Sequence, residues 1–100
     1  MAVESVGQMS LGEYVTAAKQ AFQGMFQEVS ISYEGNTMVS GTAGYKIVWR
    51  YKYQQIYVKA MQVITLTRGK AFVLTCGASE NLYATYESTF NQIVGTFVVK

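Results

Sequence analysis

The sequence contains no histidine and no aspartate. Histidine is the commonest general base and metal ligand in proteins, and aspartate is the usual acid of a catalytic triad. The six acidic residues are all glutamates, spread singly through the chain with no E-x-x-E pair that would suggest a carboxylate dyad or a metal cage. We therefore expect no enzymatic activity, no bound metal and no cofactor.

The sequence also lacks proline and has a single cysteine, Cys76. One cysteine excludes an intrachain disulfide and is typical of a reducing compartment. Its neighbours, "LTCGA", offer no base to activate a thiol, so Cys76 is expected to be a small buried residue near the end of a strand. Half of the residues are hydrophobic, which excludes a disordered chain.

Long apolar runs are missing too. No stretch approaches the ~20 residues of a membrane helix, and the N-terminus "MAVESVGQMS" has neither the basic nor the apolar region of a secretion signal. A chain of 100 residues is the size of one domain with one core. We expect a single domain over residues 1–100 that is soluble, cytoplasmic and without a membrane span.

Charge is unevenly distributed along the chain. Residues 1–34 carry a net charge of −3 and residues 80–100 carry −1, whereas residues 35–79 carry +6, which gives the total of +2. The basic residues of the middle segment are Lys46, Arg50, Lys52, Lys59, Arg68 and Lys70. If its strands lie side by side, the sheet has a basic region.

Two segments have the spacing of amphipathic helices. From Leu11 to about Glu28, apolar residues recur every three or four positions, and Ser10 with Glu13 forms an S-x-x-E capping box before them. Gly24 weakens this helix without interrupting its apolar stripe. A second helix is predicted from Leu82 to Val94, with Ser79 as its N-cap and Gly95 at its end.

The segments between and after the helices alternate like strands. "VSISYEG" and "TMVSGTAG" predict a short hairpin with a turn at "EGN". Residues 45–53, 56–67 and 70–76 predict three further strands, joined by "QQ" and by the Arg68-Gly69 turn, and "TFVVK" predicts a short terminal strand. The order is therefore helix, five strands, helix, strand. Consecutive hairpins indicate an α+β fold with an antiparallel sheet between helices, an α/β/α sandwich.

The strand "YKIVWRYKYQ" alternates aromatic or apolar residues with mostly basic ones. Such a strand can bind single-stranded nucleic acid, because bases stack on rings while cations follow the backbone. The same pattern is typical of a strand with one buried face, which we consider the better interpretation. Where this strand reaches solvent it is a candidate contact surface, because tyrosine, tryptophan and arginine dominate interface hot spots. The candidates are Tyr45, Trp49, Arg50, Tyr51, Lys52 and Tyr53.

The sequence resembles the PsbP-like superfamily, which includes extrinsic proteins of photosystem II, a nuclear Ran-binding factor and many small prokaryotic proteins. The pattern G-K-A-[FY]-V-L-T-x-x-A matches Gly69 to Ala78, and F-x-x-I-x-x-[ST]-F matches Phe90, Ile93, Thr96 and Phe97. The similarity covers about residues 3–99. It implies an antiparallel sheet between helices and no shared catalytic motif.

Members of that superfamily usually begin with one or two strands before the first helix, whereas here only "AVESV" precedes Ser10. We therefore expect the opening hairpin to be largely missing and the sheet to have an open edge. A second copy of the chain commonly closes such an edge, so we expect a homodimer.

Three functions remain open at this point. The favoured one is a non-enzymatic protein–protein interaction or structural module that associates with itself. The alternatives are a small-molecule-binding pocket between helix and sheet, and binding of single-stranded nucleic acid or another polyanion through the basic aromatic strand. The modest net charge and the lack of a known RNA-binding motif argue against nucleic acid.

Overall fold

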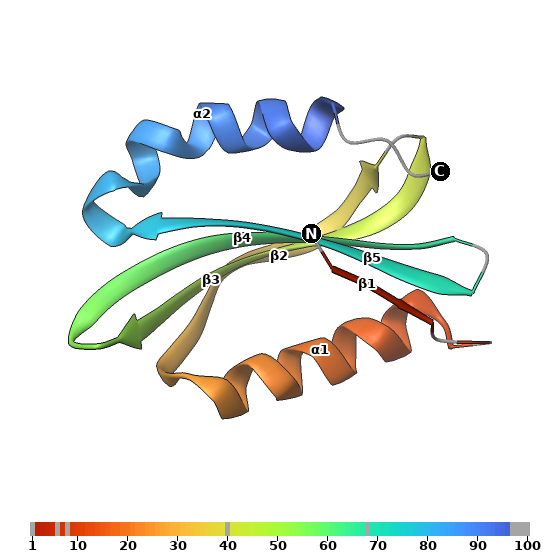
Figure 1. Cartoon of the computed structure of the whole chain (residues 1–100), viewed down its shortest axis with the longest axis horizontal. Helices are drawn as coiled ribbons and strands as arrows, with labels where there is room; N and C mark the ends of the chain where they lie inside the picture. The colour runs from red at the N-terminus through yellow and green to blue at the C-terminus, as the bar shows by residue number, and fades with distance from the viewer. Residues whose placement is uncertain (1, 6, 8, 40, 68, 97–100) are drawn as a thin grey trace.

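The computed structural model describes residues 2–5, 7, 9–39, 41–67 and 69–96. They form one antiparallel five-stranded sheet with a helix on each face (Figure 1). The elements are β1 (Ala2–Ser5), α1 (Leu11–Met25), β2 (Gln27–Val39), β3 (Thr42–Tyr53), β4 (Ile56–Thr67), β5 (Lys70–Ser79) and α2 (Glu80–Thr96). The strand order across the sheet is β1-β5-β4-β3-β2. The α+β class and the layered architecture expected from the sequence are confirmed.

The helix α1 begins as the sequence predicts. Ser10 accepts a hydrogen bond from the Glu13 amide, and the Glu13 carboxylate accepts one from the Ser10 amide, which completes the capping box. The helix continues through Gly24 but ends at Met25, earlier than predicted. Phe26 is already extended, and its ring packs 4.3 Å from that of Tyr51, so packing against β3 ends the helix.

The structure differs from the predicted strands at three places. "EGN" is not a turn, because β2 continues through Gly35 and Asn36 and the chain reverses around Gly41 instead. The N-terminal residues, for which no strand was predicted, form β1 beside β5. The predicted terminal strand is corrected at Thr96, which lies in α2, while the rest of "TFVVK" lies outside the described residues. Because Thr96 is helical, α2 continues past Gly95, where the sequence predicted its end.

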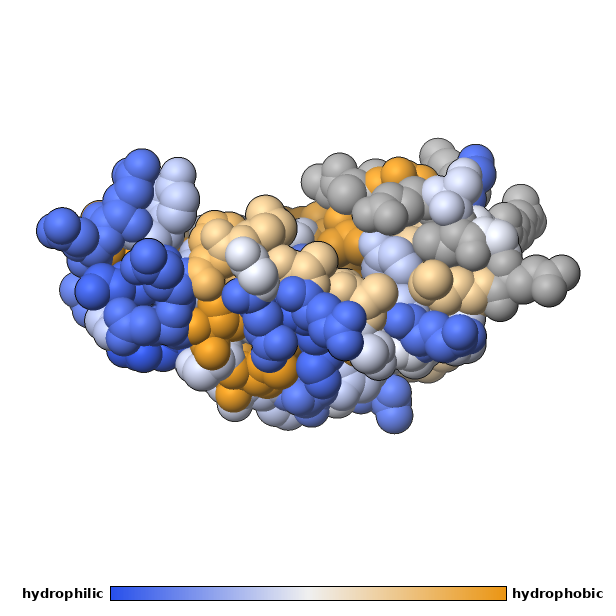
Figure 2. Space-filling model, turned by 90° about the horizontal axis from the view of Figure 1, so that it is seen from below, coloured by the Kyte–Doolittle hydropathy of each residue, from blue (hydrophilic) through white to orange (hydrophobic). Residues whose placement is uncertain are grey.

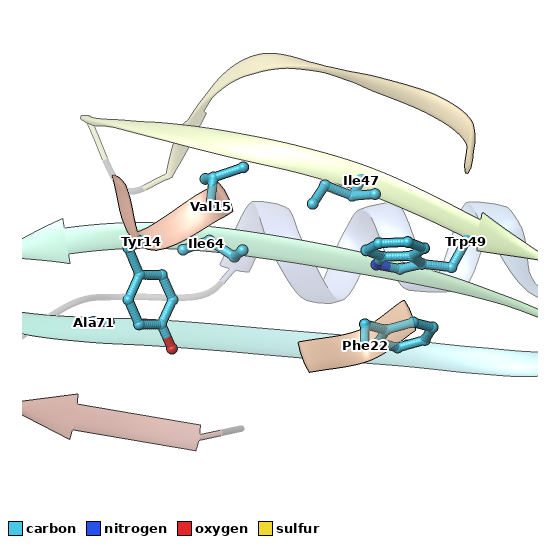
Figure 3. Close-up of a cluster of buried hydrophobic side chains, with 7 residues drawn as sticks. All are labelled: Tyr14, Val15, Phe22, Ile47, Trp49, Ile64 and Ala71. Carbon is cyan, nitrogen blue, oxygen red and sulfur yellow. The ribbon is translucent and has the colours of Figure 1, made fainter. Parts of the chain in front are cut away.

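Each face of the sheet has its own core. On the α1 face, the buried cluster joins α1 to the middle of the sheet (Figure 3), and it consists of Tyr14, Val15, Phe22, Ile47, Trp49, Ile64 and Ala71. On the α2 face, Tyr83 of the helix packs with residues of the sheet, which are Val39, Val48, Met61 and Val63. Seen from the α1 side, apolar surface (orange and tan) remains visible beside polar side chains (Figure 2).

Candidate interaction site

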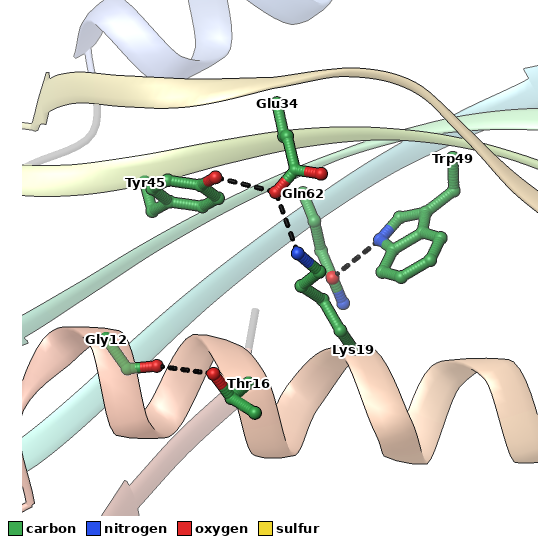
Figure 4. Close-up of polar contacts among 7 residues, drawn as sticks. All are labelled: Gly12, Thr16, Lys19, Glu34, Tyr45, Trp49 and Gln62. Carbon is green, nitrogen blue, oxygen red and sulfur yellow. Dashed lines mark hydrogen bonds and ion pairs between the residues drawn. The ribbon is translucent and has the colours of Figure 1, made fainter.

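The rings of β3 point toward α1. Trp49 is fully buried, stacks on Phe22 with ring centroids 4.3 Å apart, and donates a hydrogen bond of 3.0 Å from Nε1 to the side-chain oxygen of Gln62 (Figure 4). Tyr51 is half-buried against Phe22 and Phe26. These two rings are therefore part of the core. Tyr53, at the end of the strand, is 52% exposed.

Tyr45 is tied into a polar contact between β3, β2 and α1. Its hydroxyl donates a 2.6 Å hydrogen bond to Glu34, and the Lys19 ammonium lies 2.8 Å from the same carboxylate oxygen (Figure 4). The hydrogen bonds from Lys19 and Tyr45 lower the pKa of Glu34, and the bond to Glu34 raises the pKa of Tyr45. Tyr45 thus helps to hold the β2 side of α1 on the sheet.

The basic residues of β3 point to the α2 face, where Arg50 and Lys52 form ion pairs with glutamates and Lys46 lies over the Tyr33 ring. The Arg50 guanidinium lies over the Tyr57 ring, 3.9 Å from its centroid, and forms an ion pair with Glu80 at the start of α2. Lys52 lies 3.4 Å from Glu28 of β2. Hydrogen bonds from Tyr57 and Arg50 lower the pKa of Glu28 and Glu80 respectively, so both are ionised at neutral pH. Because Arg50 and Lys52 already have anionic partners, this strand is poorly suited to a polyanion.

The other chemical candidates have little support among the described residues. No group of three metal-ligating side chains comes together there. Cys76 lies on β5, where partial burial raises the pKa of its thiol and so disfavours the nucleophilic thiolate. Among the described residues, neither α1 nor α2 combines the length and the hydropathy needed to cross a membrane.

A wide hollow of about 530 Å³ lies where α1 meets the β3–β4 turn. Its lining residues are Met25, Phe26, Gln27, Lys52, Tyr53, Gln54 and Gln55. Its floor mixes an exposed methionine with amide side chains, and it is open to solvent. It does not have the enclosed apolar shape typical of a small-molecule pocket.

The two sides of the sheet, one ending in β2 and the other in β5 with the short β1 beside it, differ strongly as edges. The strand β2 has two register shifts against β3, a positive φ of 50° at Glu28, and the charged residues Glu28 and Glu34. Bulges and charges are the usual devices that stop an edge from pairing with another chain. The strand β5 is paired by β1 only at residues 70–73. Beyond Val73, no described residue pairs with its outer edge.

The open part of β5 has none of these protections. Its six residues, Leu74 to Ser79, include no charged side chain and no proline, and they pair with β4 in continuous register. Thr75 is exposed on the α1 face. We call this segment the β5 edge.

The helix α2 presents apolar residues on the side of this edge. Glu80 pairs with Arg50 of β3, so the Glu80 flank of the helix faces β3. At about 100° per residue, Leu82, Tyr86 and Ile93 lie roughly 200–240° around the helix from Glu80, on the opposite flank. Because α2 packs over β4 and β5, that flank faces the edge side of the sheet. These three side chains, which we call the α2 stripe, are 42–49% exposed.

The α1 face has a matching apolar groove beside β5, with a volume of about 410 Å³. Apolar surface is visible on this face in Figure 2. The groove, which we call the α1 groove, is lined by Tyr14, Ala18, Ala21, Phe22, Met25, Gln62, Val73 and Thr75. None of these residues is charged, so the β5 edge has uncharged surface above and below it.

Sequence reasoning did not identify the residues of this site. It singled out β3, whereas the open surface lies on β5, α2 and α1. Two signals were present: the uncharged run "LTCGAS", and the spacing of Leu82, Tyr86 and Ile93, which marks a second apolar flank beside the buried face of α2.

No protein-family model matches the sequence, and no curated protein is significantly similar to it. The solved structures with a similar fold include two that match nearly the whole of this chain. One is cyanobacterial PsbP (CyanoP) from Synechocystis sp. PCC 6803, with a TM-score of 0.70, 16% identity, and coverage of 98% of this chain and 64% of that one. The fold is PsbP-like.

The second structure is PA94 from Pseudomonas aeruginosa, a protein of unknown function described as a candidate regulator. It has a TM-score of 0.86 and 14% identity, and the match covers 96% of this chain and 67% of PA94. This chain therefore spans about two thirds of the length of each neighbour. Neither description names an enzymatic activity.

Proposed function

We propose that this protein is a non-catalytic interaction module that binds a partner by adding a strand to the β5 edge. The observation that carries this proposal is the contrast between the two sides of the sheet. The β2 edge is bulged and charged, whereas the β5 edge is regular, uncharged and open along six residues. An edge of this kind is a template for another strand, because its outward amides and carbonyls have no partner within the described chain.

The similar structures are compatible with this proposal without defining it. PA94 is described as a candidate regulator and CyanoP by its name alone, and at 14–16% identity they support the fold only. Strand addition needs no catalytic group, in keeping with a sequence without histidine or aspartate.

Amide hydrogen exchange of the β5 edge tests the proposal. The probe is a peptide with the sequence of residues 73–80 and serine in place of the cysteine, and the control is the same peptide with proline at its centre. The outward amides of Leu74–Ser79 should become protected either as protein concentration rises or when the peptide is added, because an added strand supplies their hydrogen-bond partners. Fast exchange that neither condition slows would refute strand addition.

A further inference from the structure

We infer that the partner strand is the β5 edge of a second copy of this chain, paired antiparallel about a twofold axis normal to the sheet. This inference rests on the proposed function and names its partner. A second copy is one of several possible sources of a strand, and three features of the surface select it.

The first feature is the shape of the uncovered surface. A lone added strand would satisfy the backbone groups of the β5 edge, but it would leave the α2 stripe and the α1 groove in water. Within these, Tyr86 is 45% exposed and Met25 is 71% exposed. A second copy brings its own helices on both faces, so one association covers the edge, the stripe and the groove together.

The second feature is symmetry. An antiparallel pair of identical edge strands requires a twofold axis normal to the sheet, which places the same face of each copy on the same side. The axis then passes at Cys76 or Gly77, near the middle of the β5 edge. The α2 stripe of one copy faces the α2 stripe of the other, and the two α1 grooves face each other across the opposite side. Each apolar surface therefore meets an identical apolar surface.

The third feature is charge. Self-association places every residue near its own copy, so a charged surface would repel itself. The β5 edge, the α2 stripe and the α1 groove contain no charged residue. The nearest ion pairs lie toward the other side of the sheet, because Glu80 is paired with Arg50 of β3 and Lys19 is paired with Glu34 of β2. The net charge of +2 thus does not oppose this pairing locally.

The association can be measured by pulsed dipolar spectroscopy with one spin label per chain. The label is placed on Ser32→Cys in a Cys76→Ala background, because Ser32 is exposed on β2, far from the proposed seam. Across the seam the strand order is β2-β3-β4-β5 followed by β5-β4-β3-β2 of the second copy, so the two β2 strands are about seven spacings of ~4.8 Å apart. The expected distance between labels is therefore roughly 34 Å. Pairing through β2 would instead give a much shorter distance.

A lysine substitution then tests the seam. Thr75→Lys places a charge on an exposed position of the β5 edge, where a monomer tolerates it and the seam would bury it against the second copy. It should abolish the dipolar signal, whereas Asn36→Lys on β2 should leave it unchanged. Circular dichroism confirms that both variants fold.

Three results would overturn the inference: no dipolar signal at high micromolar concentration, a short distance between β2 labels, or a signal that survives Thr75→Lys. If the signal is absent while the peptide of residues 73–80 still protects the β5 edge, strand addition stands and only the second copy is wrong. If both are absent, the proposed function fails as well.

Discussion

At the scale of single residues, the face on which a side chain lies decides its role. Trp49 and Arg50 are neighbours in one strand, yet the indole is fully buried against α1 while the guanidinium stacks on Tyr57 on the other face. The alternation of residue types in the sequence predicts that these two side chains lie on opposite faces of the sheet. It does not predict which of them meets solvent, because both faces of this sheet carry a helix and only the packing of Phe22 on Trp49 settles the matter.

Two glycines test the packing at this scale. Gly24 lies in α1 with open space around it, so Gly24→Ala should raise the free energy of unfolding by roughly 0.5–1 kcal/mol through helix propensity. At Gly44, an added Cβ would lie 2.8 Å from the backbone oxygen of Ile64. Gly44→Ala should therefore lower the free energy of unfolding by about 1–3 kcal/mol. Urea unfolding at one fixed protein concentration measures both. Changes of the same sign would contradict the packing described.

At the scale of elements, the sequence predicted both helices and the three strands after residue 42, because each has a clear apolar period. The prediction of elements failed where a residue type that usually marks a turn lies within a strand, and where an element is very short. The glycine in "EGN" is typical of a turn, but the Tyr33 hydroxyl lies 3.1 Å from where a Cβ of residue 35 would be. Gly35 therefore makes room for a ring within a continuous strand. The short β1 was missed because four residues carry too little pattern.

The β3–β4 turn is the element with the clearest local strain. Gln54 and Gln55 have φ values of 49° and 68°, as a two-residue type I′ turn requires, although asparagine and glycine adopt this conformation far more readily. The double substitution Gln54→Asn with Gln55→Gly should therefore stabilise the protein by about 1 kcal/mol.

Thermal and urea unfolding of this double variant measure the effect. Gly41→Ala is the reverse control, because Gly41 has a φ of 78° in the β2–β3 turn and alanine there should cost about 1 kcal/mol. Equal stability of the double variant and the parent would show that the glutamines adopt the turn without strain.

At the scale of the whole molecule, charged and uncharged surfaces are separated. The ion pairs Arg50–Glu80, Lys52–Glu28 and Lys19–Glu34 connect β3 and β2 with each other and with the helices. The opposite side of the sheet carries the β5 edge, next to the short β1 and between two apolar helix surfaces. The sequence predicted an open edge through its resemblance to longer PsbP-like proteins. Which edge stays open depends on the pairing of β1 with β5, which only the fold supplies.

The central claim is that the β5 edge joins two copies of the chain, and the solution mass tests it most directly. Multi-angle light scattering at micromolar concentration, at low and at high salt, should give twice the chain mass of 11.1 kDa under both conditions, because the proposed seam contains no ion pair for salt to screen. Thr75→Lys should reduce the mass to that of one chain. A wild-type protein that remains at 11.1 kDa at both salt concentrations would contradict the claim.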